Sequence, residues 1–160
     1  GIVTIVVNCP VDAGLIRNGP SKLDLRESDL GCEEMILAAE MMRVNQRLAS
    51  VCVRGNDLTR GGADWQACEI IAGWLAGAYN LRTLDLTATH LGDGGAVRVA
   101  RGLAEHAGLE VLMMGDNRIG SAGAAALSEG IGMMSGLRCF DLHGNPLTLV
   151  RPRDPNYDSE

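Results

Sequence analysis

Three histidines are the side chains of this 160-residue chain best suited to proton transfer or metal binding. His90, His106 and His143 fall in a turn, at a helix end and in a strand of the pattern described below, and none stands at metal-ligand spacing from another histidine or a cysteine. Their spacing does not indicate a Ser-His-Asp triad either. We therefore interpret them as surface residues and expect no enzyme, no catalytic residues, no metal and no cofactor.

The cysteines could act as nucleophiles, as zinc ligands or in disulfides. They are five in number, lie far apart and include no C-x-x-C pair: Cys9, Cys32, Cys52, Cys68 and Cys139. An odd, scattered set indicates neither a disulfide framework nor a zinc site. We interpret the cysteines as small buried hydrophobic residues, and expect the protein in the cytoplasm or another reducing intracellular compartment.

A glycine-rich stretch, Gly92-Asp-Gly94-Gly95, has the composition of a phosphate-binding loop. It lacks the lysine of the G-x-x-x-x-G-K-[ST] motif, without which the phosphates have no cation. Similar glycines recur at Gly61-Gly62 and Gly123, where the chain turns into a helix in the same pattern. We therefore predict that these glycines are architectural.

Composition narrows the class of partner. With 46% hydrophobic residues the chain can bury a core, and its formal net charge of −6 is spread along its length. No basic cluster indicates a nucleic-acid partner. No run reaches the roughly 18 apolar residues that span a bilayer. We expect a soluble protein that binds neither nucleic acid nor membranes and whose partner is another protein.

The elements that position these residues follow from an internal repeat. The segment Leu81-Arg-Thr-Leu84-Asp-Leu86 recurs as Leu109-Glu-Val-Leu112-Met-Met114 and as Leu137-Arg-Cys-Phe140-Asp-Leu142, at a constant interval of 28 (109 − 81 and 137 − 109). Two earlier copies begin at Pro20 and Leu48, at the same interval (48 − 20). A fixed period of this length is typical of repeat proteins.

One interval is longer than the others. From Leu48 to Leu81 it is 33 (81 − 48), and Gly61-Gly62-Ala63 aligns with Gly94-Gly95-Ala96 without a gap. This alignment places the additional residues between positions 63 and 72. We predict that they lengthen the second helix.

Each unit contains a strand, a turn and a helix. The strand has apolar residues with period two, and the helix has them at helical spacing, as in Gly123-Ala124-x-x-Leu127. Three residues after each apolar strand comes a turn position occupied by Ser28, Asn56, Thr89, Asn117 and Asn145. We expect an asparagine there to satisfy backbone groups of the turn, and serine or threonine to do so less well.

The pattern L-x-x-L-x-L-x-x-N-x-L, followed by a Gly-Ala-x-x-Leu helix, resembles the ribonuclease-inhibitor-like subclass of leucine-rich repeat proteins. This resemblance implies an α/β solenoid, curved, with a parallel β-sheet on its concave side and α-helices on its convex side. We assign residues 1–19 to an irregular N-terminal strand or partial cap, in which Ile2, Ile5 and Val7 follow the strand pattern. Residues 20–148 hold repeats that start at 20, 48, 81, 109 and 137, the last partial, and residues 149–160 form a tail or linker.

Neither end carries a clear polar cap, which a solenoid needs. We therefore expect a segment of a larger protein, or a subunit of an assembly, whose ends are covered by flanking repeats or neighbouring subunits.

The concave face is the expected binding surface of such a solenoid. Its predicted partner-binding residues are those that alternate with the apolar strand positions: Lys22, Asp24, Arg26, Arg54, Asp85, Val111, Met113, Asp141 and His143. Arg26 and Arg54 should lie one strand apart, roughly 5 Å, beside Asp24. Val111 and Met113 should form a small apolar window. The alternative interpretation is a solvated face without a partner.

A second candidate surface lies on the first helix, where Ile36, Leu37 and Met41 fall outside the apolar stripe that faces the core. It would be either an interaction surface or a site covered by residues 1–19. Trp65 and Trp74 of the second unit are expected to fill the core and to pack between neighbouring helices.

These features predict a non-enzymatic protein-interaction or scaffold module. One alternative is a regulator of a small GTPase, since the sequence also resembles the repeat region of the Ran GTPase-activating proteins. Another is the ligand-sensing repeat region of an innate-sensor-like protein. A ribonuclease inhibitor itself would be longer, richer in cysteine and more strongly acidic.

Overall fold

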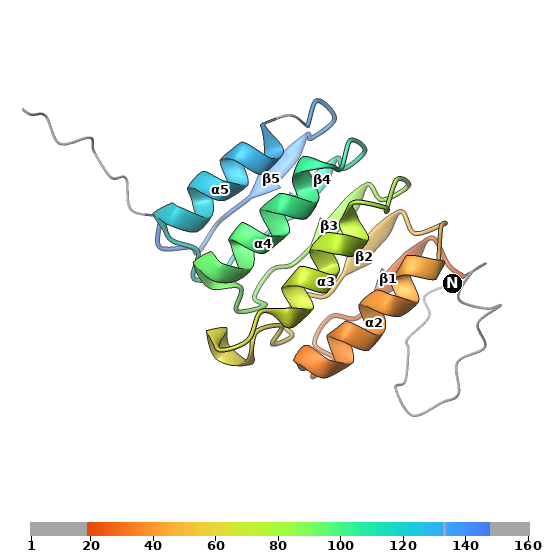
Figure 1. Ribbon diagram of the computed structural model, residues 1–160, viewed down its shortest axis with the longest axis horizontal. Helices are drawn as coiled ribbons and strands as arrows, with labels where there is room; N and C mark the ends of the chain where they lie inside the picture. Colours follow the sequence, from red (N-terminus) through yellow and green to blue (C-terminus); the bar gives the residue numbers. More distant parts are fainter. Residues whose placement is uncertain (1–18, 133, 148–160) are drawn as a thin grey trace, which may run out of the picture.

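The computed structural model describes residues 19–132 and 134–147. This part of the chain is an α/β structure with five parallel strands and four α-helices (Figure 1). In chain order the elements are β1 (Lys22–Asp24), α2 (Cys32–Val44), β2 (Ser50–Cys52), the 3-10 turn η1 (Arg60–Gly62), α3 (Gln66–Leu75), β3 (Thr83–Asp85), α4 (Gly92–Ala104), β4 (Val111–Met113), α5 (Ser121–Ile131) and β5 (Cys139–Asp141). The N-terminal strand expected at Ile2, Ile5 and Val7, and the tail at 149–160, lie outside the described residues.

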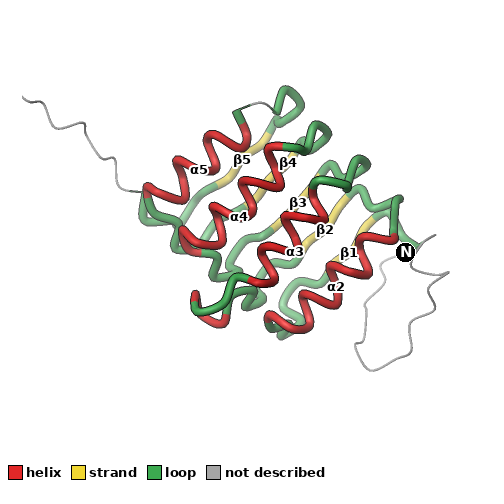
Figure 2. Tube along the Cα trace, in the orientation of Figure 1, coloured by secondary structure: helices red, strands yellow, loops and turns green. Residues whose placement is uncertain are grey.

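The strands follow one another in the sheet in the order of the sequence, β1-β2-β3-β4-β5. Leu23 pairs with Val51, and Leu84 with Leu112, so residues at the same position of the repeat are neighbours. A helix lies between each strand and the next, and the helices of the described residues all lie on one face of the sheet (Figure 2). A helix between successive strands returns the chain to the start of the next parallel strand.

The core lies between the sheet and the helices. Leu84 and Leu112 from the strands are buried, and α4 contributes Val99 and Leu103 at helical spacing. The helices pack closely because glycines face their neighbours: a Cβ on Gly102 would stand only 2.5 Å from the carbonyl oxygen of Ala72. Backbone therefore packs directly against backbone between α3 and α4.

Asparagine side chains support the turns that follow the strands. Nδ2 of Asn117 donates to the carbonyl oxygens of Leu86 and Met114 at 2.7 and 3.1 Å. Its Oδ1 accepts from the backbone N–H groups of Thr89 and Leu91 at 2.9 and 3.2 Å. Asn56 and Asn145 make the equivalent bonds in other units. The expectation that asparagine satisfies the turn is confirmed.

Thr89 fills the same position less completely, as expected. Its hydroxyl donates to the carbonyl oxygen of Leu86 at 2.7 Å, within its own unit. In the turn before it, Leu58 N therefore donates to the backbone carbonyl oxygen of Thr89, at 3.3 Å, and not to an asparagine side chain.

The prediction that the second unit has a longer helix is wrong. α3 has 10 residues, against 13 in α2 and α4. The additional residues form η1 and its flanks before the helix, where Gly61 and Gly62 have φ values of +70° and +98°. Such values end a right-handed helix and favour glycine. Gly61-Gly62-Ala63 is therefore not equivalent to Gly94-Gly95-Ala96, which lies within α4.

Trp65 and Trp74 pack as expected. Trp74 is buried in the core. The ring of Trp65 lies against Gly94 of α4, where a Cβ would approach it to 2.7 Å, and the Arg98 guanidinium stands 4.9 Å from the ring centroid.

The patch expected on α2 is smaller than predicted. Leu37 is 52% exposed, whereas Ile36 is half-buried against the core and Met41 is half-buried. Of the proposed covering segment, residues 1–18 lie outside the described part of the chain. Across residues 19–132 and 134–147, no helix combines the length and apolarity needed to cross a membrane.

Candidate functional site

The face of the sheet opposite the helices, called here the open face, carries the predicted partner-binding residues. Strand register forms two rows across the sheet: Lys22, Ser50, Thr83, Val111 and Cys139 in one, and Asp24, Cys52, Asp85, Met113 and Asp141 in the other. The predicted residues Arg26, Arg54 and His143 lie outside these rows, two residues after the ends of β1, β2 and β5. The predicted alignment of these positions is confirmed. The rows bring together side chains from all five strands of the sheet, which lie far apart in the sequence.

The β1–β2 end of the open face is basic. A guanidinium nitrogen of Arg26 lies 2.6 Å from Oδ2 of Asp24, and Arg26 Nε donates to both carboxylate oxygens at 2.9 Å. These hydrogen bonds lower the pKa of Asp24. The exposed guanidinium of Arg54, two residues after the end of β2, has no ion pair within the described residues. Arg54 therefore leaves a positive charge open to a partner.

The middle of the open face holds the acidic group of Asp85, which forms no salt bridge among the described residues. Oδ1 of Asp85 accepts from Thr87 N at 2.9 Å, and the Cys52 thiol donates to its Oδ2 at 3.5 Å. Burial, with the nearby Asp85 charge, raises the pKa of Cys52, so it is a thiol at neutral pH and a poor nucleophile. Beside Asp85, Val111 and Met113 of β4 are half-exposed, which supports the predicted apolar window.

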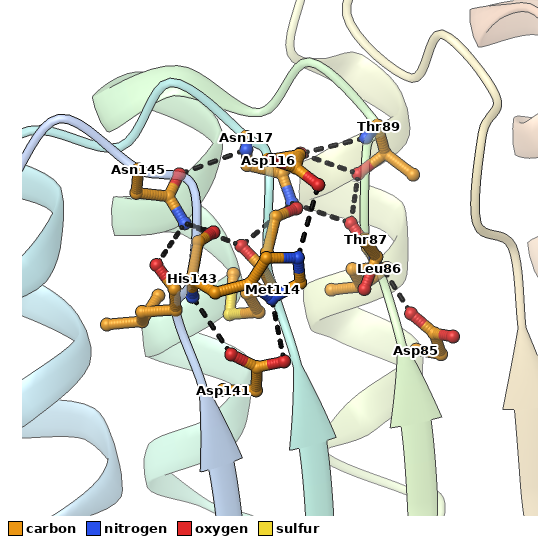
Figure 3. A network of polar contacts seen from close by, with 12 residues as sticks. Asp85, Leu86, Thr87, Thr89, Met114, Asp116, Asn117, Asp141, His143 and Asn145 are labelled. Carbon is orange, nitrogen blue, oxygen red and sulfur yellow. Dashed lines mark hydrogen bonds and ion pairs between the residues drawn. The ribbon is translucent and has the colours of Figure 1, made fainter.

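The β4–β5 end holds a histidine between two carboxylates (Figure 3). Nδ1 of His143 lies 2.8 Å from Oδ2 of Asp141, and its Nε2 lies 3.2 Å from Oδ2 of Asp116. The backbone N–H of His143 donates to Oδ1 of Asp141 at 2.9 Å. The bond to Asp141 and its charge raise the pKa of His143, and the bonds from His143 lower the pKa of Asp141.

Two glycines leave the space that this arrangement needs. The ring of His143 occupies the volume where a Cβ on Gly115 would stand, and the carboxylate of Asp116 occupies the corresponding volume at Gly144. Sequence reasoning missed Asp116 because it lies in a turn, outside the strand rows. The signal that could have found it is Gly115, a residue without a side chain beside the bulky His143.

Both ring nitrogens of His143 are engaged with carboxylates, and the Thr87 hydroxyl is buried without a hydrogen-bond partner among the described residues. Within the same residues no group of three or more His, Cys, Asp or Glu side chains could hold a metal ion. What the arrangement can do is present fixed charges around an apolar window.

The interpretation of all three histidines as surface residues is wrong for His106, which is 4% exposed. Its Nε2 lies 2.9 Å from the carbonyl oxygen of Ala78, and Gly108 N donates to its Nδ1 at 3.1 Å. His106 thus joins the ends of neighbouring units. His90 and His143 are partly exposed.

The cysteines also divide into buried and more exposed residues. Cys32 and Cys68 are buried, as predicted, and burial raises the pKa of Cys68 to about 12. Cys52 is half-buried on the open face and Cys139 is exposed, so the prediction fails for Cys139. Cys9 lies outside the described residues.

We expect His143 to titrate with a pKa above the ordinary imidazole value of about 6.5. Because the folded pKa is raised, the associated stabilisation is present below the unfolded pKa and is lost as pH rises through the folded one. Asp141→Asn should return the value toward normal, while Asp29→Asn in the first turn should not. NMR titration of the ring protons measures this. A His143 pKa unchanged in Asp141→Asn would contradict the assigned pairing.

Comparisons with known proteins do not identify a relative. No family model matches the chain, and no curated protein matches it.

Proposed function

We propose that the chain is a non-enzymatic protein-interaction module, built as a curved solenoid of leucine-rich repeats of the ribonuclease-inhibitor-like subclass. The sequence frame supports this, as do the parallel strands in repeat register and the asparagines that support the turns. Solenoids of this kind present a broad sheet surface to their partners.

The observation that carries the proposal is the charge distribution of the open face. Its β1–β2 end offers the Arg54 guanidinium, which has no ion pair among the described residues, and its β4–β5 end carries two carboxylates around one histidine. The half-exposed Val111 and Met113 lie near the acidic end. A complementary partner is a protein segment with an acidic group over Arg54, an apolar side chain over β4 and a basic group near Asp116.

Such a face discriminates between partners through complementary charge. Asp85 forms no salt bridge among the described residues, so it would attract a basic group near the centre. Like charges placed opposite each other weaken the wrong complexes, and opposite charges speed association with the right one. The partner class is therefore a segment of mixed charge, not a uniformly acidic or basic one.

Photo-crosslinking tests the proposal. A photoreactive amino acid at Met113 should capture a partner, identified by mass spectrometry, that the same group at Glu129 on α5 does not capture. The Kd of that purified partner should then rise about 10-fold or more in Arg54→Glu, since a lost complementary contact becomes a like-charge one. Arg101→Glu, exposed on α4, serves as the matched control.

Equal crosslinking at both positions would remove the open face as the binding surface. Equal affinity of Arg54→Glu and Arg101→Glu would reject the charge complementarity while leaving the sheet face open to another mode of contact.

A further inference from the structure

Among the described residues, β5 lies at one end of the sheet and pairs with a neighbouring strand on one side only (Figure 1). Between earlier units the backbone bonds repeat: Arg82 O accepts from Glu110 N and Val111 N, and Glu110 O accepts from Arg138 N and Cys139 N. The next acceptor in this series is Arg138 O. It has no partner within the described residues.

The donors of the same edge form a second series. Leu86 N and Ala88 N donate to the strand end of the following unit, and Met114 N and Asp116 N do the same one unit later. The next donors are Leu142 N and Gly144 N, which have no backbone acceptor in the part of the chain that is described. The edge therefore presents acceptors and donors at the spacing of a parallel strand.

The apolar side chains of β5 and of the residue that follows it are also less covered than those of the inner strands. Phe140 and Leu142 are half-buried, whereas Leu84 and Leu112 of the inner strands are 1% and 0% exposed. Leu147, after the turn, is 44% exposed. Within residues 19–132 and 134–147, no element covers the outer side of the layer that β5 contributes to the core.

The turn asparagines also leave a bond unmade at this end of the sheet, among the described residues. Each asparagine accepts with its Oδ1 from the backbone of the preceding turn, as Asn145 does from Asn117 N and Ile119 N at 3.0 and 2.9 Å. The N–H of Asn145 itself has no such acceptor within the described residues. An amide oxygen from one further turn would complete the series.

The helices show a similar series of contacts on their own side of the sheet. Ala96 and Ala100 of α4 receive the glycines of α5, with a Cβ on Gly130 falling 2.5 Å from the carbonyl oxygen of Ala100. One repeat period later in the sequence, Ala124 and Ser128 occupy the equivalent positions of α5. Ser128 is exposed and Ala124 is half-buried, so both small residues remain accessible to another helix.

We infer that the outer side of β5 and α5 is an interface for one further strand-turn-helix unit in the same frame. The occupant carries two alternating apolar residues in a parallel strand, an asparagine in its turn and a glycine on the helix face toward Ser128. This chemistry follows from the interfaces between the existing units. Among the described residues, the backbone acceptors, the backbone donors, the turn asparagines and the small helix residues each lack their next partner at β5 and α5. An antiparallel second copy would pair with the edge but would place no amide against Asn145.

A tandem insertion tests the interface in the full chain. A second copy of residues 120–147 is inserted directly after Leu147, followed by residues 148–160. Hydrogen exchange at the amides of Leu142 and Gly144 should slow at least about 100-fold, because they gain backbone acceptors in a cooperative unit. The same insertion with Asn145→Ala in the copy only should give clearly less protection.

A second variant distinguishes packing from folding. Ser128→Leu should leave the melting temperature of the original chain nearly unchanged, since the residue is exposed there. In the extended chain it should abolish the protection of Leu142 and Gly144, because a leucine blocks the approach of the added helix.

Unchanged exchange at these two amides in the extended chain would overturn the inference. Strong protection of both amides in the original chain would also overturn it. Protection that does not depend on protein concentration would mean that another part of the chain covers β5. Protection that does depend on concentration would mean that a second copy of the chain covers it. Sedimentation velocity separates these two. The interface is distinct from the open face, so loss of partner binding in Arg54→Glu does not bear on it.

Discussion

Asn117→Ala is expected to lower the free energy of unfolding by about 3–5 kcal/mol. Asn117 is 0% exposed, and its Oδ1 is the acceptor for the backbone N–H groups of Thr89 and Leu91. Both donors lose this partner in the variant, at a cost of about 1–3 kcal/mol for each buried unsatisfied group.

The carbonyl oxygens that accept from Asn117 contribute less to the loss of stability, because they keep other donors. Leu86 O retains the hydroxyl of Thr89, and Met114 O retains Nδ2 of Asn145. The cost therefore arises mainly on the donor side, where no other side chain of the described residues accepts from the two N–H groups. Urea unfolding followed by far-UV circular dichroism measures it.

Asn145→Ala is the matched comparison for Asn117→Ala. Asn145 makes the same set of bonds in the last described turn but is less buried, so water can replace part of them. We expect less than half the loss seen for Asn117→Ala. A loss below about 1 kcal/mol for Asn117→Ala would contradict the assigned role of the asparagines.

Gly102→Ala is expected to destabilise the protein by about 2–3 kcal/mol, although alanine is the better helix former. The new Cβ would stand 2.5 Å from the carbonyl oxygen and 2.6 Å from Cα of Ala72. Both are backbone atoms, which cannot rotate away as a flexible side chain does. α3 and α4 must separate, and the layer beneath them loses its close packing.

Gly73→Ala is the control for Gly102→Ala. Gly73 lies at a similar place in α3, and no atom stands within 4 Å of its added Cβ. Alanine there should stabilise the protein by about 0.5–1 kcal/mol through its helix propensity. The two substitutions should therefore have opposite signs in the same urea experiment. Equal effects would show that close helix contact does not require the glycine at 102.

The sequence period predicted most of the fold because each unit has the same order of strand, turn and helix. Strand side chains alternate between the two faces, so aligning the strand pattern of each repeat was enough to place Lys22, Ser50 and Thr83 in one row. The turn asparagines were predicted for the same reason, since their bonds recur from unit to unit.

The position of the additional residues in the second unit was predicted wrongly because the glycines were aligned by residue type and not by backbone conformation. Oδ1 of Asp57 accepts from Gly61 N at 3.0 Å, and the Thr59 hydroxyl accepts from Gly62 N at 2.9 Å. These bonds hold a tight turn before α3, so the helix begins only at Gln66. Backbone dihedral angles decide this, and a glycine is compatible with either outcome.

The sequence by itself determined the repeating frame, the residues that share the open face and the absence of a recognisable catalytic motif, because these depend on period and residue type. The tertiary structure alone decided that Asp116 and Asp141 flank His143. That contact joins two strand ends and needs the empty volumes of Gly115 and Gly144, which no spacing rule encodes. Close packing also decided that His106 is buried, because its environment comes from the neighbouring unit.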